Sequence, residues 1–469
     1  MERTSRPNVV WVTVDSVRAD RTTMGGHHRD TTPNLQRIAA DPGGDWFDTC
    51  IAQTRWTPAS TASMLTGTYL STHGVGVDSP EVSRLPDSLA TMPELLADAG
   101  YESLGIATNQ YVCSATGMDR GFDEFQFPTV RNLHRTVGLR AVADYARNIR
   151  QYGPGLSTDR SLHNISSMVT HKAKQWTAAT ADAETPVFLY VHYNGTHYPY
   201  TPPPAFLEPY AREIGQSVDE VLERSRSIFE DVFDVVAEDL PLSDDDFAAI
   251  SAAYDAGVAY VDHLVGDLFD HVRERLPGET IVVVTGDHGE AFGEHGWLGH
   301  HVLVTDELLH VPMVTHGLPD TAGGTGQPVQ HVDFTKTVLA AVGVDDDQLE
   351  GVDLASERRD YAVAQRAARD GDRQKLLARN PSFDADRYRW DALNCLHDGR
   401  FKYVTGEAGS DLFALPDEET DRAGDYPSVA AAMASELDAR MPSFATGGDG
   451  QTAAFDDRMR ERLADMGYI

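Results

Sequence analysis

Four runs of apolar residues alternate along the chain with segments whose apolar positions recur at helical spacing. Near-continuous apolar runs are typical of strands that are buried on both faces of a parallel sheet. The segments 32–41, 58–67 and 88–100 predict helices, and a glycine that suits a helix C-terminus follows or ends the last two. Strands that alternate with helices predict an α/β fold around a mostly parallel sheet. The apolar runs are PNVVWVTVDS (7–16), YESLGIATNQ (101–110), PVFLYVHYNGTH (186–197) and TIVVVTGDHGE (280–290).

Other segments are more polar and indicate how the chain is divided. Segments 128–180 and 205–275 are rich in charge with irregular periodicity, so we expect helical inserts there. The triple-aspartate runs within them and near residue 346 are typical of solvated faces or helix starts. Beyond about residue 350, the stretch RWDALNCLHDGRFKYVTG predicts a hairpin that turns at Asp398-Gly399. We therefore expect a catalytic domain over 1–350 and a C-terminal subdomain over 351–469.

Polar side chains stand at the ends of all four predicted strands. In open α/β sheets, ligands bind beyond the carboxyl ends of the strands, so we expect these side chains to meet at one edge of the sheet. Each has a simpler interpretation when taken alone, because strand-end Asp, Asn and His residues commonly cap turns or hydrogen-bond locally. The residues are Asp15 after the first strand, Asn109 in the second, His192 and His197 in the third, and Asp287 and His288 in the fourth.

The stretch GDHGEAFGEHGWLGHH (286–301) combines a carboxylate with four histidines. Its glycines allow tight turns, so several side chains can converge on one point. Neutral imidazole together with carboxylate suits Zn²⁺ or Mn²⁺, whereas a calcium site would be all oxygen. We expect Asp287 and His288, joined by Asp15, to bind a divalent metal ion, with Mn²⁺ or Zn²⁺ favoured and Ca²⁺ or Mg²⁺ as alternatives. His295 and His301 are explained equally well as hydrogen-bonding loop residues.

The stretch WTPASTASMLTG (56–67) reads as a short helix with a hydroxyl at its start. We expect Thr57 to be the N-cap, Pro58 to take the first helical position and Gly67 to follow the last turn. A helix N-terminus attracts anions, and a hydroxyl held there beside a divalent cation can attack phosphorus or sulfur. Ser60 is a second hydroxyl, which a backward bond along its own helix explains more simply.

The composition narrows the classes of function. The 73 acidic against 39 basic residues give a net charge of −34, and only five of the basic residues are lysines. Such a surface is typical of a halophile's cytoplasmic protein, with an acidic mesophilic protein as the alternative, and it argues against nucleic-acid binding. Three distant cysteines indicate neither disulfides nor a zinc knuckle. With no export signal and no apolar run long enough to span a membrane, we expect a cytoplasmic protein without a membrane segment.

Several motifs occur in an order that resembles the sulfatase family of the alkaline-phosphatase-like superfamily, particularly the sulfatase-like hydrolases of haloarchaea. The resemblance implies a three-layer α/β/α fold with a small C-terminal α+β subdomain. The motifs are Asp15, the helix that ends SMLTG (63–67), THGV (72–75), HYNGTHYPYTPP (192–203), DHGE (287–290), GHH (299–301), HVPMV (310–314) and, more weakly, FKYVTGEAGSDLFALPDEETD (401–421).

The chain also departs from the family's pattern. Thr57 falls where sulfatases have the residue that is oxidised to formylglycine, and threonine cannot undergo that conversion. Thr61 replaces the signature arginine, Ser16 replaces the second Asp of a pair, and His288 replaces a late Asn. The active-site Lys corresponds to His300 or its neighbour. These changes make the chain look more like the phosphodiesterase and phosphonate monoester hydrolase branches of the superfamily.

The resemblance implies a role for each candidate residue and an ester-cleaving activity. We expect a metal-dependent hydrolase of phosphate, phosphonate or sulfate esters that prefers phosphodiesters, acting on a small-molecule, saccharide or lipid-head-group ester. Two alternatives stay open, a transferase that passes the group to a sugar or lipid, and a non-catalytic binding protein. The sequence does not specify an oligomeric state. The expected catalytic residues are Thr57, His197 and His300, the substrate-binding residues Asn109 and His192, and the metal ligands Asp15, Asp287 and His288.

Overall fold

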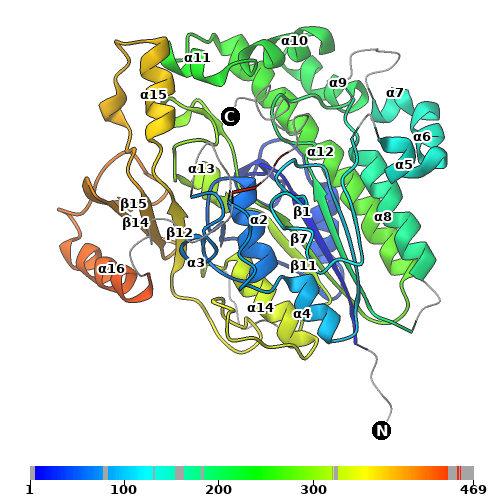
Figure 1. Ribbon diagram of the computed structural model, residues 1–469. Helices are drawn as coiled ribbons and strands as arrows, with labels where there is room; N and C mark the ends of the chain where they lie inside the picture. The colour runs from blue at the N-terminus through cyan, green and yellow to red at the C-terminus, as the bar shows by residue number, and fades with distance from the viewer. Residues whose placement is uncertain are drawn as a thin grey trace.

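The computed structural model describes residues 6–77, 83–129, 132–153, 163–180, 184–319, 321, 326–441, 452–453 and 455. Its centre is a seven-stranded sheet in the order β2-β11-β7-β1-β6-β4-β5 (Figure 1). The four predicted strands are its neighbouring parallel strands β7, β1, β6 and β4, so the predicted α/β class and mostly parallel sheet are confirmed. The strands are β1 (Asn8–Val14), β2 (Gly44–Trp46), β4 (Glu102–Ala107), β5 (Glu124–Gln126), β6 (Val187–Tyr193), β7 (Thr280–Gly286) and β11 (Met313–His316).

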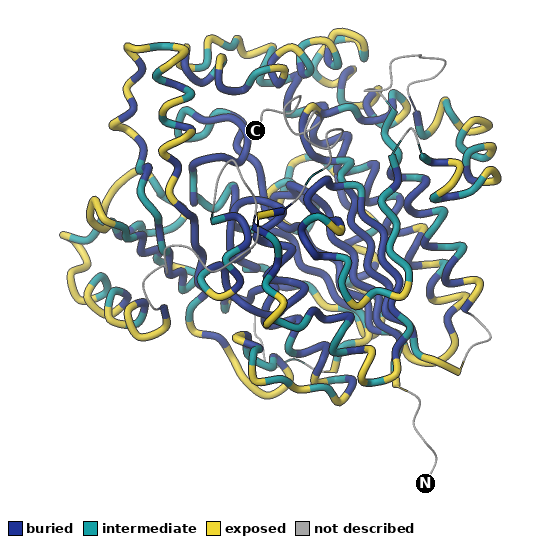
Figure 2. Tube along the Cα trace, viewed as in Figure 1, coloured by how far each residue is buried: buried dark blue, intermediate teal, exposed yellow. Residues whose placement is uncertain are grey.

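Helices cover both faces of this sheet, which makes three layers. Alternate residues of β1 point to opposite faces, as the pleat of a strand requires. Val10 and Val12 pack with the helices of one layer, and Val9 and Trp11 pack with those of the other. The buried strands form the interior of the molecule in Figure 2. The first layer contains α1 (Pro33–Ala40), α8 (Ser166–Thr180) and α12 (Asp244–Arg275), and the second contains α2 (Thr57–Thr66), α4 (Met92–Asp98) and α14 (His331–Ala341).

The described parts of segments 128–180 and 205–275 are largely helical. The longest helix, α12, begins after Ser243, whose side chain accepts a hydrogen bond from the backbone of Asp246 in a capping box. The aspartates of the run 244–246 fill its first turn, where their negative charges interact favourably with the positive end of the helix dipole. The other helices are α5 (Leu133–Thr136), α6 (Gly138–Arg147), α7 (Ile149–Tyr152), α9 (Pro204–Glu213), α10 (Val218–Ile228) and α11 (Val232–Ala237).

A second, antiparallel sheet of four strands lies in the C-terminal part of the chain. The predicted hairpin is confirmed, since its two central strands turn at Asp398-Gly399 and Gly399 has a φ of 89°. The backbone N–H of Gln365 donates to the backbone oxygen of Gln53 at 2.8 Å and so ties this sheet to the segment that precedes α2. Its elements are β12 (Ala362–Arg366), β13 (Leu393–His397), β14 (Phe401–Gly406) and β15 (Gly409–Ala414), with α15 (Asp370–Arg379) and α16 (Pro427–Arg440).

Among the described residues no helix has both the length and the hydropathy of a transmembrane span. Several short helices and strands connect the elements named above. They are the helices α3 (Leu70–His73) and α13 (Asp306–Leu309) and the strands β3 (Cys50–Ile51), β8 (Ala291–Phe292), β9 (Leu298–Gly299) and β10 (His310–Val311).

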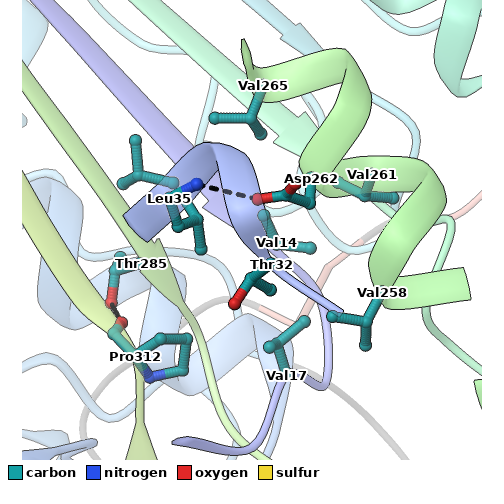
Figure 3. Close-up of a pocket in the computed structure, with 11 residues that line it drawn as sticks. Val14, Val17, Thr32, Leu35, Val258, Val261, Asp262, Val265, Thr285 and Pro312 are labelled. Atoms are coloured by element: carbon teal, nitrogen blue, oxygen red, sulfur yellow. Dashed lines mark hydrogen bonds between the residues drawn. The ribbon is translucent and has the colours of Figure 1, made fainter. Parts of the chain in front are cut away.

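A small, mostly apolar cavity of about 20 Å³ lies between the sheet and α12 (Figure 3). Asp262 of α12 borders it and accepts hydrogen bonds from the backbone N–H groups of Asn34 and Leu35, at 3.0 and 2.9 Å. The side chain of Asn34 adds a third bond at 2.8 Å. A buried carboxylate of one helix therefore caps the free N-terminus of another, α1.

We expect Asp262→Ala to lower the free energy of unfolding by about 1–3 kcal/mol, because two backbone donors of α1 lose their acceptor. The matched control is Asp270→Ala on the same helix, whose exposed pair with Arg37 is worth at most about 1 kcal/mol. Urea titrations of the variants at equal salt measure both effects. Equal losses for the two variants would contradict the assignment.

The cost of Asp262→Ala should also depend on pH. Burial raises the pKa of Asp262 from 3.8 to about 6, so its carboxyl favours the folded state most at low pH, and this contribution is lost as the pH rises through about 6. The difference in unfolding free energy between the natural protein and the variant is therefore expected to be larger at about pH 5 than at about pH 8.

Candidate active site

The carboxyl edge of the sheet gathers the predicted site residues. Strands β1 and β7 are adjacent and parallel, with Val14 opposite Gly286, so Asp15 and Asp287 emerge side by side. Strand β6 lies on the other side of β1, and β4 lies beyond it. All eight predicted residues are buried, and the four at 0% exposure are Asp15, His192, Asp287 and His288.

Helix α2 begins one residue earlier than predicted. Trp56 is the N-cap, because its backbone is extended (φ −152°, ψ 153°) and helical geometry starts at Thr57. The prediction of Thr57 as N-cap was therefore wrong, and Pro58 occupies the second helical position. Gly67 ends the helix in the left-handed region at φ 69°, as predicted.

The hydroxyl of Thr57 points into the cluster of strand-end side chains. Its Oγ1 lies 3.4 Å from Asp15 Oδ2 and 3.3 Å from His288 Nε2. Asn109 Nδ2 donates to the same oxygen at 3.2 Å. Thr57 is 3% exposed. The structure therefore brings together the predicted nucleophile, two predicted metal ligands and one predicted substrate-binding residue.

The two aspartates differ in how their oxygens are satisfied. Asp15 accepts from Ser16 Oγ on Oδ1 at 2.8 Å and from Asn109 Nδ2 on Oδ2 at 2.7 Å. Asp287 Oδ1 accepts from the backbone N–H groups of Ser16 and His288, at 3.0 and 2.9 Å. Asp287 Oδ2 is buried and has no hydrogen-bond partner among the described residues. This oxygen is free to bind a cation.

The electrostatics of the pair are those of two like charges in a dry site. Burial and the negative charge of Asp15 raise the pKa of Asp287 well above its usual value. Burial alone would also raise the pKa of Asp15, but the neighbouring imidazoles, first His197 and then His192 and His288, lower it well below that value. Without a cation, ionising both carboxylates costs free energy, because the two negative charges repel each other and are shielded from water.

Ser16 joins the two aspartates and was not predicted as a site residue. It has a φ of 57°, in the left-handed region that non-glycine residues seldom adopt. This turn lets its N–H reach Asp287 while its hydroxyl reaches Asp15. Tyr254 of α12 donates to the Ser16 backbone oxygen at 2.7 Å and holds the turn in place. The sequence signal was only its position after a strand-end Asp.

His288 presents an unprotonated nitrogen to the cluster. Its Nδ1 lies 2.8 Å from the Gly289 backbone oxygen, so Nδ1 carries the proton and Nε2 keeps its lone pair. Nε2 is 3.7 Å from both Asp15 Oδ1 and Asp287 Oδ2. Burial, with the proximity of the His300 imidazole, lowers the pKa of His288 well below its usual value, so the ring is neutral. These are the properties of a metal ligand.

His192 lies with the carboxylates rather than at the rim of the site. Its Nε2 is 3.6 Å from Asp15 Oδ2 and has no hydrogen-bond partner among the described residues. Its Nδ1 lies 3.2 Å from the hydroxyl of Tyr190. The ligand atoms of Asp15, His192 and Asp287 all fall within 4.8 Å of one another. Sequence reasoning, which favoured substrate contact for His192, missed this arrangement.

His197 and His300 form a second group next to the first. Their ring centroids are 5.1 Å apart, and the His300 ring lies 4.5 Å from that of His288. His197 Nδ1 is 2.5 Å from the Tyr198 backbone oxygen. His300 Nδ1 lies 2.9 Å from Glu290 Oε1. Burial, with the charge of His197, lowers the pKa of His300 well below its usual value, so His300 stays neutral.

The remaining histidines of the 286–301 stretch take structural positions. His301 lies parallel to His300, with 5.7 Å between ring centroids. His295 Nε2 lies 3.8 Å from Glu307 Oε2, and its side chain is 20% exposed. The contacts that the structure gives for His295 include none of the predicted site residues.

Two hydroxyls hold the backbone of the aspartates. Ser60 Oγ donates to the backbone oxygen of Asp287 at 2.7 Å, so it bonds across to β7 and not backward along α2 as expected. Thr196 Oγ1 donates to the backbone oxygen of Asp15. Sequence spacing could not reveal either contact, because each joins segments more than 180 residues apart.

The donor set fits a divalent cation. It supplies the carboxylates of Asp15 and Asp287, of which Asp287 Oδ2 has no hydrogen-bond partner among the described residues, and the imidazoles of His192 and His288. All four side chains are fully buried. A cation would offset the repulsion between Asp15 and Asp287. Nitrogen and oxygen donors together suit Zn²⁺ or Mn²⁺, with Ca²⁺ and Mg²⁺ as alternatives.

Comparison with known proteins identifies a family and several relatives of this chain. The sequence model of the sulfatase family matches residues 7–344. The uncharacterized sulfatase YidJ of Escherichia coli is 22% identical over 358 residues, which cover 72% of this chain and 68% of YidJ. The low-salt glycan biosynthesis sulfotransferase Agl7 of Haloferax volcanii is 39% identical over 93 residues, or 18% of this chain and 22% of Agl7. The crystal structure of the phosphonate monoester hydrolase of Agrobacterium radiobacter superposes with a TM-score of 0.69 at 21% identity, covering 96% of this chain and 100% of that one.

We expect the natural protein to bind about one Mn²⁺ or Zn²⁺ per chain, and Asp15→Asn to weaken binding by roughly 100-fold or more, since it removes a charge from the site. The control is Asp20→Asn, a change in the same loop at a side chain that is 56% exposed. Metal content after dialysis and titration with a chelator measure both. Equal binding by the two variants, or a natural protein that stays empty in millimolar metal, would refute the assignment.

Proposed function

Because the chain belongs to the sulfatase family, we propose that it is a metal-dependent hydrolase of phosphate, phosphonate or sulfate esters with Thr57 as nucleophile and phosphodiesters as favoured substrates. Its family and its relatives make it an ester-hydrolysing enzyme with an alkaline-phosphatase-like fold. One observation carries the finer proposal, the position of Thr57 Oγ1 within 3.4 Å of Asp15, Asn109 and His288 at the start of a helix.

The identity of the nucleophile favours phosphorus chemistry. Thr57 bears a secondary alcohol, so it cannot yield the aldehyde hydrate on which the usual sulfatase route depends. A direct attack by its oxygen leaves a threonine ester, which water must then cleave. The superposition with a phosphonate monoester hydrolase supports this direction through the fold alone.

The first step forms a bond from Thr57 Oγ1 to phosphorus and breaks the bond to the leaving oxygen, and the hydroxyl proton leaves toward Asp15 Oδ2, to which the hydroxyl donates at 3.4 Å. Asp15, Asp287, His288 and His192 would hold a divalent cation, whose chemistry when bound is to acidify the hydroxyl and to neutralise the non-bridging oxygens. Asn109 Nδ2 donates toward the reacting group. The free N–H groups at the start of α2 favour the anionic substrate.

The leaving oxygen must receive a proton, and His197 is the better placed of the two predicted histidines. The Tyr198 backbone oxygen holds Nδ1 and so fixes the orientation of the ring, from which Nε2 would deliver a proton to the leaving group. His300 is neutral and buried, which suits a residue that supports the His197 ring rather than a proton donor. Water then cleaves the Thr57 ester and restores the hydroxyl.

Transfer to an acceptor other than water is a second candidate. The segment similar to the Haloferax sulfotransferase Agl7 supports it, although that segment covers only 18% of the chain. An assay with a sugar acceptor present distinguishes the two, because a transferase forms phosphorylated or sulfated sugar and correspondingly less free phosphate or sulfate.

The acidic surface also supports our proposal that the protein acts in a salt-rich cytoplasm.

We expect Thr57→Ala to lower kcat/KM for bis-p-nitrophenyl phosphate by about 10³-fold or more, because no oxygen remains to attack. Thr57→Ser should keep part of the activity. Thr66→Ala, which removes a hydroxyl that bonds Ala62 at the far end of the same helix, is the control and should change the rate little. Substantial diester cleavage by Thr57→Ala would exclude this nucleophile, and a main activity toward p-nitrophenyl sulfate would exclude the diester preference.

Loss of His197 should depend on the leaving group. We expect His197→Ala to slow cleavage of an alkyl ester by about 10²–10⁴-fold but that of a p-nitrophenyl ester far less, because p-nitrophenolate leaves without a proton. Rates across a series of leaving groups measure the difference, with His295→Ala as the control at a partly exposed histidine. An equal loss for all esters would assign His197 another role.

A further inference from the structure

We propose that Tyr190 is a positioning residue that turns His192 into a nitrogen ligand of the cation, and that this pair makes the site prefer Zn²⁺ or Mn²⁺ to Ca²⁺ or Mg²⁺. The role rests on the proposed function in one respect, that the site holds a divalent cation. It concerns the residues that hold the cation and not the reacting groups, so measurements of metal binding test it without turnover.

The geometry begins with an imidazole whose two nitrogens have different surroundings. His192 is fully buried, and its Nε2 points at the carboxylates, 3.6 Å from Asp15 Oδ2, with no hydrogen-bond partner among the described residues. Its Nδ1 lies 3.2 Å from Tyr190 Oη. A buried polar atom without a partner is costly, so an unsatisfied nitrogen that faces two carboxylates is suited to bind a cation.

The position of the single imidazole proton decides whether His192 can bind metal. A neutral ring carries its proton on one nitrogen, and Nε2 is a ligand only when Nδ1 holds it. Nδ1–H then needs an acceptor inside the protein. Tyr190 Oη is the acceptor that the described residues provide, and a hydroxyl can accept this bond while donating its own proton elsewhere. Phenylalanine could do neither.

The proton of the Tyr190 hydroxyl also has a destination. Thr13 of β1 and Thr61 of α2 lie beside it, and both are buried. The Thr61 hydroxyl forms no other hydrogen bond within the described part of the chain, so it is able to accept. Burial raises the pKa of Tyr190, which keeps the hydroxyl protonated and neutral. A chain of hydrogen bonds can therefore run from His192 through Tyr190 to Thr61.

The residue type at position 61 supports this arrangement. It occupies the position of the arginine in the signature that the chain resembles, and arginine offers only donors and a fixed positive charge. A cationic side chain here would offer Tyr190 no acceptor and would repel a cation held by His192. A neutral threonine at position 61 and a histidine at position 192 are thus compatible with each other, and the histidine supplies the nitrogen donor.

Nitrogen donors determine which metal a site selects. Imidazole suits Zn²⁺ and other transition metals, whereas Ca²⁺ and Mg²⁺ prefer oxygen. Groups that orient a ligating histidine through its second nitrogen typically change metal affinity 10–100-fold. Removal of the Tyr190 hydroxyl should therefore weaken binding of Zn²⁺ and Mn²⁺ and leave the binding of Ca²⁺ and Mg²⁺ nearly unchanged.

The test compares Tyr190→Phe with Tyr193→Phe by competitive titration of the full chain with Zn²⁺, Mn²⁺, Ca²⁺ and Mg²⁺. Tyr193 lies on the same strand but faces the other side of the sheet, where its hydroxyl bonds Thr170 Oγ1 at 2.8 Å. We expect Tyr190→Phe to lower the ratio of Zn²⁺ to Ca²⁺ affinity at least about tenfold. Tyr193→Phe should leave this ratio unchanged.

Two further variants keep the outcome decisive if Tyr190→Phe folds poorly. Thr61→Val should lower the same ratio by a smaller factor, since it removes only the final acceptor. His192→Ala should lower it as much as Tyr190→Phe, and the double variant should show no further loss. A natural ratio in Tyr190→Phe or Thr61→Val would overturn the role while leaving the metal site intact. A natural protein that binds none of the four ions would overturn both this role and the metal dependence.

Discussion

Two buried carboxylates side by side, Asp15 and Asp287, are the constraint around which the rest of the site is arranged. They are adjacent because β1 and β7 pair in parallel with Val14 opposite Gly286. Burial of two like charges is expensive unless a cation or a proton lies between them, and the raised pKa of Asp287 expresses that cost. The fold keeps the pair, so a bound divalent cation is the simplest account of why the site is built this way.

The surroundings hold this pair from several layers of the fold. The turn at Ser16, in the left-handed region, hydrogen-bonds both carboxylates, and α12 secures it through Tyr254. Ser60 of α2 holds the backbone of Asp287, and the same helix presents Thr57. A strained turn persists only where its neighbours over-determine it. The proposed nucleophile and the proposed ligands are therefore positioned by shared contacts, which explains why helices of both layers contribute to one site.

Much of this could be predicted from sequence because it follows from local pattern. Apolar runs identified four central strands, and the rule that strand ends converge placed Asp15, Asn109 and Asp287 together. The rest depends on contacts between distant segments. The partner of Ser60, the direction of His192 and the exact residue at which α2 begins are set by packing, and no periodicity in the chain encodes them. Propensity alone favoured Thr57 as the cap, but the extended backbone at Trp56 decides otherwise.

The central claim is that Thr57 becomes covalently modified during turnover, and mass spectrometry of the rapidly quenched enzyme tests it most directly. The protein, loaded with Mn²⁺ in molar KCl, would be mixed with bis-p-nitrophenyl phosphate, quenched with acid and digested. Our account predicts a transient p-nitrophenyl phosphoryl group on the peptide that contains Thr57, assigned to that side chain by fragmentation and absent from Thr57→Ala. Diester turnover without any adduct, or with the adduct on Ser60, would contradict it.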